Sequence, residues 1–438
     1  MALAFSRVVL AVCLCWSLAQ VLASVGVHEE LAVPSVVLRR WAEAPRPTFT
    51  DAQLLGLLKG DPDQNRDVCG IIMDKGYACE RRQVVTEDGY ILTVHRIPST
   101  SNDKKVPPKV ALLQHGLLDS AATWVINMAN NSLPYLMANE GYDVWLANSR
   151  GNIYSLKHKT LSTDSVEFWD FNFDQMALYD LPAIITSALN VTGAKQLTYI
   201  GHSQGSMIGF ALFSSNQVIA SKIKAFVGLA PVAFVNNIDS PLLDVLVSIP
   251  ETVDYFLFGK KDFMLGQDGF AKVMPVLCQY IPSLCTNVLC LLAGCENNYN
   301  FNNSRMAVLL SHFPAGTSVQ DLMHFRQAVL NNKFQMYDYG FVGNVKRYNQ
   351  PNPPTYDLTK FSPPSFIFSG LKDTLADPKD VQHTLQLIPR PVISQVYADW
   401  GHADFVWGLD AAKRLYIPLL GMLRDHEAKG NLLSTNNN

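Results

Sequence analysis

The 438-residue sequence lacks any long run of lysine or arginine, and its formal net charge is only -3. Proteins that bind nucleic acid through its phosphates need a strongly basic surface, so we expect no nucleic-acid partner. Internal repeats are also missing. Hydrophobic residues make up 48% of the chain and charged residues 17%, which is enough apolar material for a large buried core that needs no disulfide to fold.

No stretch of the predicted mature chain is apolar for long enough to span a bilayer. The first residues differ, because Arg7 precedes an apolar run over 8–22 and the residues at 21–23 resemble a small-residue cleavage site. We therefore predict that residues 1–23 are a signal peptide; a retained anchor is the alternative interpretation. The protein is then expected to be secreted or lysosomal (or vacuolar). Three N-glycosylation sequons, at Asn130, Asn190 and Asn302, are compatible with that route.

Histidines at metal-ligand spacing are missing around the cysteines. Of the eight cysteines, Cys13 and Cys15 lie in the signal segment, and six free thiols would be unusual in an oxidising compartment. We therefore expect disulfides, and neither a metal site nor a cofactor. The disulfide candidates are Cys69, Cys79, Cys278, Cys285, Cys290 and Cys295.

Strand-like and helix-like patterns alternate through most of the chain, which predicts an α/β fold with a mostly parallel sheet. A β-hairpin is expected over 82–98. The strand-like runs are 110–114, 143–147, 196–200, 225–229, 365–369 and 393–397, and the helix-like stretches are 133–140, 173–189 and 206–213.

The alternation is lost between about residues 236 and 354, so we interpret this segment as a cap inserted into the core. The predicted domains are a first core part over 24–235, the cap over 236–354, a second core part over 355–425 and a polar tail over 426–438. An ordinary packed subdomain is the alternative to a cap that acts as a lid.

Residues 201–205 read Gly-His-Ser-Gln-Gly and fit the G-x-S-x-G nucleophile elbow, with a strand-like run before them and a helix-like stretch after them. Gly201 and Gly205 suit such a turn because the serine backbone is strained and neighbouring chains pass close to it. Ser203 is the predicted nucleophile. A serine hydroxyl is a weak nucleophile at neutral pH, so it needs a histidine to accept its proton and a carboxylate to orient that histidine.

His402 is the predicted base, because it alone among the later histidines directly follows a late strand. The acid is contested between three aspartates that follow the strand at 365–369. Asp377 precedes Pro378 and fits a helix N-cap, and Asp380 falls in the first turn of that helix. Asp373 lies in the loop directly after the strand and is the predicted acid.

An oxyanion that develops during acyl transfer needs two backbone N–H donors, one after the nucleophile and one in the loop after the third strand. Gln204 is expected to supply the first and Leu117 the second. His115 is expected to support the turn and not to carry a proton.

With these residues in place, the sequence resembles the acid lipase family of α/β-hydrolases, which includes gastric, lysosomal, plant and insect members. The resemblance spans about residues 67–424. It includes the motifs at 115–118, 143–151, 201–205, 311–318, 375–378 and 402–405. It implies the same catalytic residues, a cap over a hydrophobic acyl-binding cleft, and a neutral lipid ester, triacylglycerol or steryl ester, as a substrate met at an oil or membrane interface.

The resemblance also bears on the disulfides, because the early cysteines Cys69 and Cys79 resemble a cysteine pair in the plant members of the family. The four later cysteines are expected to pair among themselves, and Cys278 with Cys285 is favoured among three possible connectivities.

Other functions of the same fold stay open, namely a peptidase, a serine esterase, a thioesterase or an acyltransferase acting on smaller substrates. A catalytically silent lipid carrier is a rival from another class. Ser203 excludes the enzymes of this fold that use an aspartate nucleophile.

Overall fold

The computed structural model describes residues 61–100, 107–240, 243, 247–248, 259–264, 293, 300–389 and 391–435. The predicted signal peptide lies outside the described residues, and so do the four later cysteines, Cys278, Cys285, Cys290 and Cys295.

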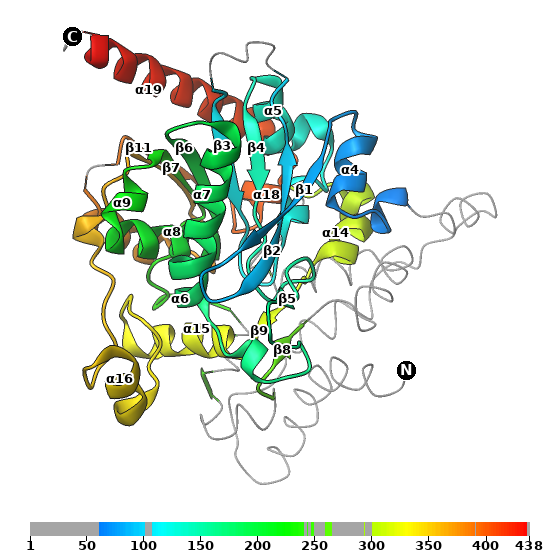
Figure 1. Cartoon of the computed structure of the whole chain (residues 1–438). Coiled ribbons are helices and arrows are strands. Elements are labelled where there is room, and N and C mark those ends of the chain that lie inside the picture. The colour runs from blue at the N-terminus through cyan, green and yellow to red at the C-terminus, as the bar shows by residue number, and fades with distance from the viewer. Residues whose placement is uncertain are drawn as a thin grey trace, which may run out of the picture.

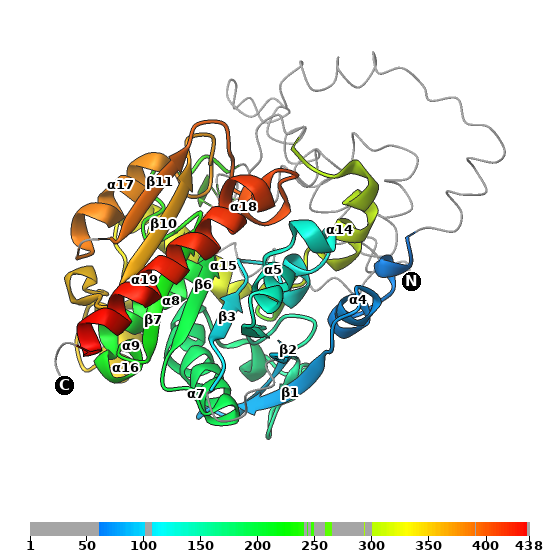
Figure 2. The same ribbon diagram turned by 90° about the horizontal axis from the view of Figure 1, so that it is seen from above.

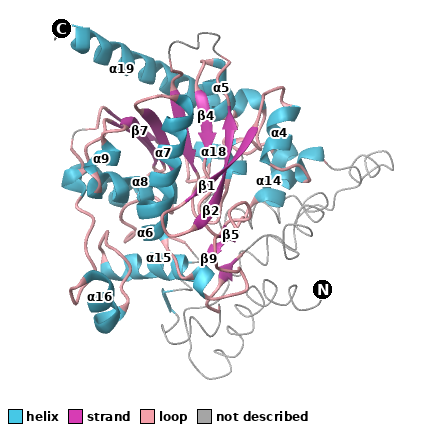
Figure 3. Cartoon of the chain, in the orientation of Figure 1, coloured by secondary structure: helices cyan, strands magenta, loops and turns pink. Residues whose placement is uncertain are grey.

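A mostly parallel sheet forms the centre of the described chain (Figures 1 and 3). Its strand order is β1-β2-β4-β3-β6-β7-β10-β11, with β5 paired to β2. Strand β2 is antiparallel to β1, β4 and β5, and the other pairs are parallel. The bounds are β1 Glu80–Val85, β2 Tyr90–Ile97, β3 Val110–Gln114, β4 Asp143–Leu146, β5 Lys157–His158, β6 Leu197–His202, β7 Ile223–Leu229, β10 Ser365–Gly370 and β11 Ile393–Tyr397.

The central strands have apolar runs because both faces of the sheet are covered. Every residue of β3, β4, β6 and β10 is buried, as expected for parallel strands packed between two layers of helices. The edge strand β11 instead alternates between partly buried and exposed residues up to its last residue, Tyr397, which is buried. The predicted α/β-hydrolase fold is confirmed, and each predicted strand is present within two residues of its expected bounds.

Helices lie on both sides of the sheet. Helices α7 (Leu181–Thr192), α8 (Gln204–Ser215) and α17 (Pro378–Leu387) cover one face, and α5 (Leu133–Asn139) and α19 (Ile417–Thr435) cover the other (Figure 2). The other α-helices described in the core are α4 Val68–Asp74, α6 Phe173–Gln175, α9 Gln217–Ala220 and α18 Asp404–Trp407. None of the helices described in the structure is long and apolar enough to cross a membrane.

The helix predicted over 173–189 is interrupted. It consists of α6, a π-helical turn at Met176–Asp180, and α7. Pro182 lies in the first turn of α7 and has no N–H to donate to the carbonyl of residue 178, so the regular α-helical ladder cannot continue through this point.

Within the predicted cap, the described elements are mainly helical. They are α14 Met306–His312, α15 Val319–Asn331, α16 Gly340–Tyr348 and the antiparallel pair β8 Asp262–Phe263 with β9 Thr317–Ser318. In Figure 1, α15, α16 and the β8–β9 pair lie together below the sheet.

A disulfide joins Cys69 to Cys79, with 5.4 Å between their Cα atoms. It ties helix α4 to the segment that leads into strand β1. The expected pairing of these two cysteines is confirmed.

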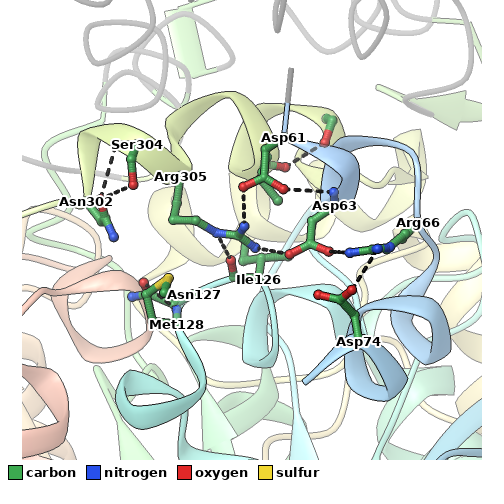
Figure 4. A network of polar contacts seen from close by, with 12 residues as sticks. Asp61, Asp63, Arg66, Asp74, Ile126, Asn127, Met128, Asn302, Ser304 and Arg305 are labelled. Atoms are coloured by element: carbon green, nitrogen blue, oxygen red, sulfur yellow. Dashed lines mark hydrogen bonds and ion pairs between the residues drawn. The ribbon is translucent and has the colours of Figure 1, made fainter. Parts of the chain in front are cut away.

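A buried carboxylate connects the first described residues to the predicted cap (Figure 4). Asp63 is 1% exposed and accepts hydrogen bonds from Arg66 (2.8 Å), Lys75 (2.9 Å) and Arg305 (2.7 Å). Arg305 precedes α14, and its guanidinium also binds Asp61 and donates to the Ile126 carbonyl at 2.7 Å. Burial alone would raise the pKa of Asp63, but the hydrogen bonds from its three cationic partners outweigh it and lower the pKa to about 2.

Replacing Asp63 with Asn should lower the free energy of unfolding at pH 7 by about 3 kcal/mol, because three cations lose a buried partner. The depressed pKa of Asp63 contributes stability that is present above about pH 4 and is lost as the pH falls toward 2. The free energy of unfolding of both proteins should be measured with urea between pH 7 and 2.5. The difference in this free energy between wild type and variant should become smaller below about pH 4. Asp61→Asn, at a side chain that is 32% exposed, is the control and should cost less. A difference in unfolding free energy between wild type and Asp63→Asn that stays constant with pH would contradict this account.

Candidate active site

Ser203 lies at the sharp turn between strand β6 and helix α8. Its backbone has φ 54° and ψ −123°, a conformation that a residue with a side chain rarely adopts and that costs about 1–3 kcal/mol. The peptide N–H of Ser203 donates to the carbonyl of Leu229 on β7 (3.1 Å), and its carbonyl accepts from the Ser206 hydroxyl (2.6 Å). The surrounding structure thus holds the serine in the strained turn.

Both glycines of the elbow are required by close packing. A Cβ on Gly201 would lie 2.6 Å from the backbone of Gly205, and a Cβ on Gly205 would lie 2.4 Å from the carbonyl oxygen of Gln114. Both distances are too short for real carbon contacts. The strand before the serine and the helix after it can approach each other, and strand β3, only with glycine at these positions.

Asp373 and His402 meet at the same end of the sheet. Asp373 follows β10 and His402 follows β11, and the histidine Nδ1 lies 3.0 Å from each carboxylate oxygen. The Oδ1 atom of Asp373 also accepts from the backbone N–H groups of Leu375 (2.9 Å) and Ala376 (2.7 Å). The carboxylate is therefore fixed by its own loop, and it favours the tautomer with the proton on Nδ1. That tautomer leaves Nε2 as a proton acceptor.

The two competing aspartates have structural partners. Asp377 caps α17, accepting from the N–H of Lys379 at 2.8 Å, which confirms its predicted N-cap position. Asp380 lies in the first turn of α17 as expected. Its two oxygens also accept from the backbone and side chain of Asn237 at 2.8 and 2.7 Å, which no local sequence pattern indicated.

Ser203 and His402 line one pocket, and Leu117 lies in its wall. The loop at Gly116 packs directly on Ser203, since a Cβ there would lie 3.0 Å from the Ser203 Cβ. Gln204, the other expected oxyanion donor, follows Ser203 directly and is buried. Most of the remaining lining is apolar and comes from Leu118, Val232, Val235, Ile238, Leu243, Ala293, Phe313, Phe325, Leu375, Ala403, Val406 and Trp407.

His202 is a site residue that the sequence did not single out. Its Nε2 lies 3.1 Å from the carbonyl oxygen of His402, so Nε2 carries the proton and donates it to that carbonyl. Burial lowers the pKa of His202 to about 3, which keeps its ring neutral. His202 therefore holds the loop of His402 in place without adding a charge to the pocket.

His115 supports the neighbouring turn, as expected. Its Nδ1 lies 2.8 Å from the Gly116 carbonyl oxygen, and its Nε2 accepts from the backbone N–H of Ser149 at 3.0 Å. Burial lowers its pKa to about 4, so the ring is neutral near pH 7.

The three glycosylation candidates lie at or near the surface. Asn130 and Asn190 are exposed, and Asn302 is partly buried, where its Oδ1 accepts from the Ser304 N–H at 3.1 Å. Their modification stays a prediction.

The groups in this pocket have the properties that nucleophilic acyl transfer requires. A strained serine hydroxyl and a histidine oriented through Nδ1 by a fixed carboxylate share one pocket. Backbone N–H groups at the start of a helix adjoin the serine. Such a set can add the serine oxygen to a carbonyl carbon and stabilise the negative charge that forms.

Comparisons with known proteins identify the family of this chain. The family model described as alpha/beta hydrolase fold matches residues 110–409, and the model described as partial alpha/beta-hydrolase lipase region matches residues 68–128. Gastric triacylglycerol lipase and lysosomal acid lipase/cholesteryl ester hydrolase, both from Homo sapiens, are each 44% identical to this chain. Each match covers 84% of this chain and 93% of the relative.

A solved structure from Sulfolobus solfataricus shares the fold at 12% identity. It has a TM-score of 0.52, and the match covers 79% of this chain and 99% of that one. Because the sequence matches are this long and this similar, the chain belongs to the acid lipase family of α/β-hydrolases.

Proposed function

We propose that this protein is a lipase that hydrolyses carboxylic esters of neutral lipids, with Ser203 as nucleophile, His402 as base and Asp373 as the acid that orients the base. The observation that carries the proposal is the two-oxygen contact of Asp373 with His402 Nδ1, in a loop that lines the same pocket as the strained Ser203. The backbone N–H groups of Leu117 and Gln204 are the proposed oxyanion donors.

The proposed reaction proceeds in two halves. The Ser203 oxygen attacks the ester carbonyl carbon while His402 Nε2 accepts the hydroxyl proton. The tetrahedral oxyanion collapses when the alcohol leaves with that proton, and the acyl group stays on Ser203. Water, activated by the same histidine, then attacks the acyl-enzyme and releases the fatty acid.

The proposed substrate class is a neutral lipid ester, either triacylglycerol or steryl ester. The names of the two human relatives include one compound of each kind, a triacylglycerol and a cholesteryl ester. The mainly apolar lining of the pocket also suits a fatty acyl chain better than a polar acyl group. Smaller acyl substrates are the alternative within the same mechanism.

We further propose that residues 236–354 form a cap over this pocket. Ile238, Leu243, Ala293, Phe313 and Phe325 all belong to this segment and all line the pocket with Ser203. A cap that contributes apolar side chains to the pocket is suited to a substrate met at an oil or membrane interface.

The proposed route of the protein, secretion or delivery to the lysosome, is supported by the disulfide between Cys69 and Cys79.

Ser203→Ala and His402→Ala should each lower turnover by a factor on the order of a million, because the two side chains act as a unit. Binding of the lipid should survive, since neither change fills the pocket. The measurement is the steady-state rate on emulsified triacylglycerol and on steryl ester, together with labelling by a fluorophosphonate probe. Near-normal turnover in Ser203→Ala would remove the assignment.

Asp373→Asn should lower turnover by about four orders of magnitude, because an amide in place of the carboxylate favours the wrong histidine tautomer. Asp377→Ala is the matched control in the same loop. It should retain turnover and lose about 1 kcal/mol of stability with the helix cap. Turnover and thermal midpoint should be measured on both variants, and the opposite pattern would exchange the roles of the two aspartates.

The proposed cap predicts that catalysis depends on an interface. If the cap shields the pocket in water and opens at a lipid surface, the rate on a short-chain triglyceride should jump when its concentration passes the solubility limit. Simple saturation below that limit would contradict a lid.

A further inference from the structure

The segment from Ala315 to Asp321 contacts both parts of the chain that carry the proposed oxyanion donors, Gln204 itself and the loop of Leu117. Most of it falls within the motif at 311–318 that the sequence shares with the acid lipases, and the proposed reaction gives that motif no role. Besides its pairing with β8, it contacts the nucleophile elbow at one end and the loop after β3 at the other.

The contact with the elbow is made by Asp321. The side-chain Nε2 of Gln204 donates to both carboxylate oxygens of Asp321, at 3.0 and 2.8 Å, and both residues are buried. The Thr317 hydroxyl donates to the same carboxylate at 2.9 Å. Gln204 is the residue whose backbone N–H is the proposed oxyanion donor, so this contact fixes the residue that follows the nucleophile.

The position of Asp321 in the first turn of its helix would ordinarily give its side chain a capping role. Ser318 is the N-cap of α15 and accepts from the N–H of Asp321 at 3.0 Å, which is half of a capping box. In a complete capping box, the side chain at this position would turn back to the N-cap backbone. Asp321 instead extends its carboxylate to Gln204, so capping does not explain the side chain.

The contact with the loop of the second donor, Leu117, is made by the backbone. The N–H of Ala315 donates to the carbonyl of Leu118 at 2.6 Å, and the carbonyl of Ala315 accepts from the N–H of Ile153 at 3.0 Å. Leu118 follows the proposed donor Leu117 and has φ 61°, a backbone conformation that needs outside support.

We propose that Asp321 is a positioning residue for the oxyanion hole, and that the segment Ala315–Asp321 holds its two donors in register. Asp321 does not touch the reacting atoms and acts through Gln204. This role rests on the proposed serine-hydrolase function. It follows that the loss of Asp321 lowers kcat with little change in KM, because the donors bind the transition state and not the ground-state ester.

The test compares kcat and KM for Asp321→Leu, Gln204→Leu and the double variant. Each single change should lower kcat by about tenfold to a hundredfold, which is the scale of a displaced transition-state donor. The double variant should be no slower than the slower single variant, because the two side chains form one interaction. The proposal would be overturned if the kcat losses of the two single variants multiplied in the double variant. It would also be overturned if Asp321→Leu, measured below its unfolding temperature, had the kcat of the wild type.

His324→Leu is the matched structural control. His324 is equally buried on the same helix, one turn on, and its hydrogen bonds go to Asn172 and Gln335. It should lower the thermal midpoint and leave kcat unchanged. A kcat loss as large in His324→Leu as in Asp321→Leu would mean that the helix as a whole matters, and it would overturn the specific role of Asp321.

If Asp321→Leu does not fold, Asp321→Asn can be used, because it retains one acceptor for Gln204. It should show a severalfold loss of kcat, and a wild-type kcat in this variant would overturn the proposal.

Labelling of wild-type Ser203 by a fluorophosphonate separates a failure of the positioning role from a failure of the proposed function. An unlabelled, inactive wild type refutes the proposed function itself, whereas a labelled and active wild type with unaffected Asp321 and Gln204 variants refutes only the positioning role.

Discussion

The strained backbone of Ser203 is the constraint on which the rest of the site depends. A residue at φ 54° keeps that conformation only if its neighbours leave it no other. Strand β7 fixes its N–H, Ser206 fixes its carbonyl, and the glycines on either side let β3 and α8 pack against the turn. The central strands are therefore both the core of the protein and the support that holds Ser203, the proposed nucleophile.

The parts of the site that follow local sequence patterns could be predicted. The elbow at 201–205 has a strand before it and a helix after it, and Asp373 and His402 each follow a strand at the same edge of the sheet. The cap position of Asp377 was accessible too, because an aspartate next to Pro378 carries the local signature of a helix N-cap.

The contacts between distant segments could not be predicted in this way. The bond between Gln204 and Asp321 spans 117 positions, and the one between Asp380 and Asn237 spans 143. No periodicity or cap rule links such residues, because their partners are chosen by the folded arrangement. His202 was missed for the same reason: only the fold brings the His402 carbonyl within 3.1 Å of its ring. The π-helical turn before Pro182 was missed because the helical spacing of apolar residues continues across it.

The long insert between β7 and β10 also has a consequence for how the protein is made. In the proposed triad, the nucleophile at 203 leaves the ribosome about 170 residues before the acid at 373, which at about 5–20 residues per second is roughly ten to thirty seconds. The histidine emerges later still, and strands β10 and β11 must then add to a sheet edge that β7 has left open. During synthesis the serine therefore has neither its base nor its orienting acid. A hydrolase with this chain order stays inert toward lipid esters until almost the whole chain has been completed.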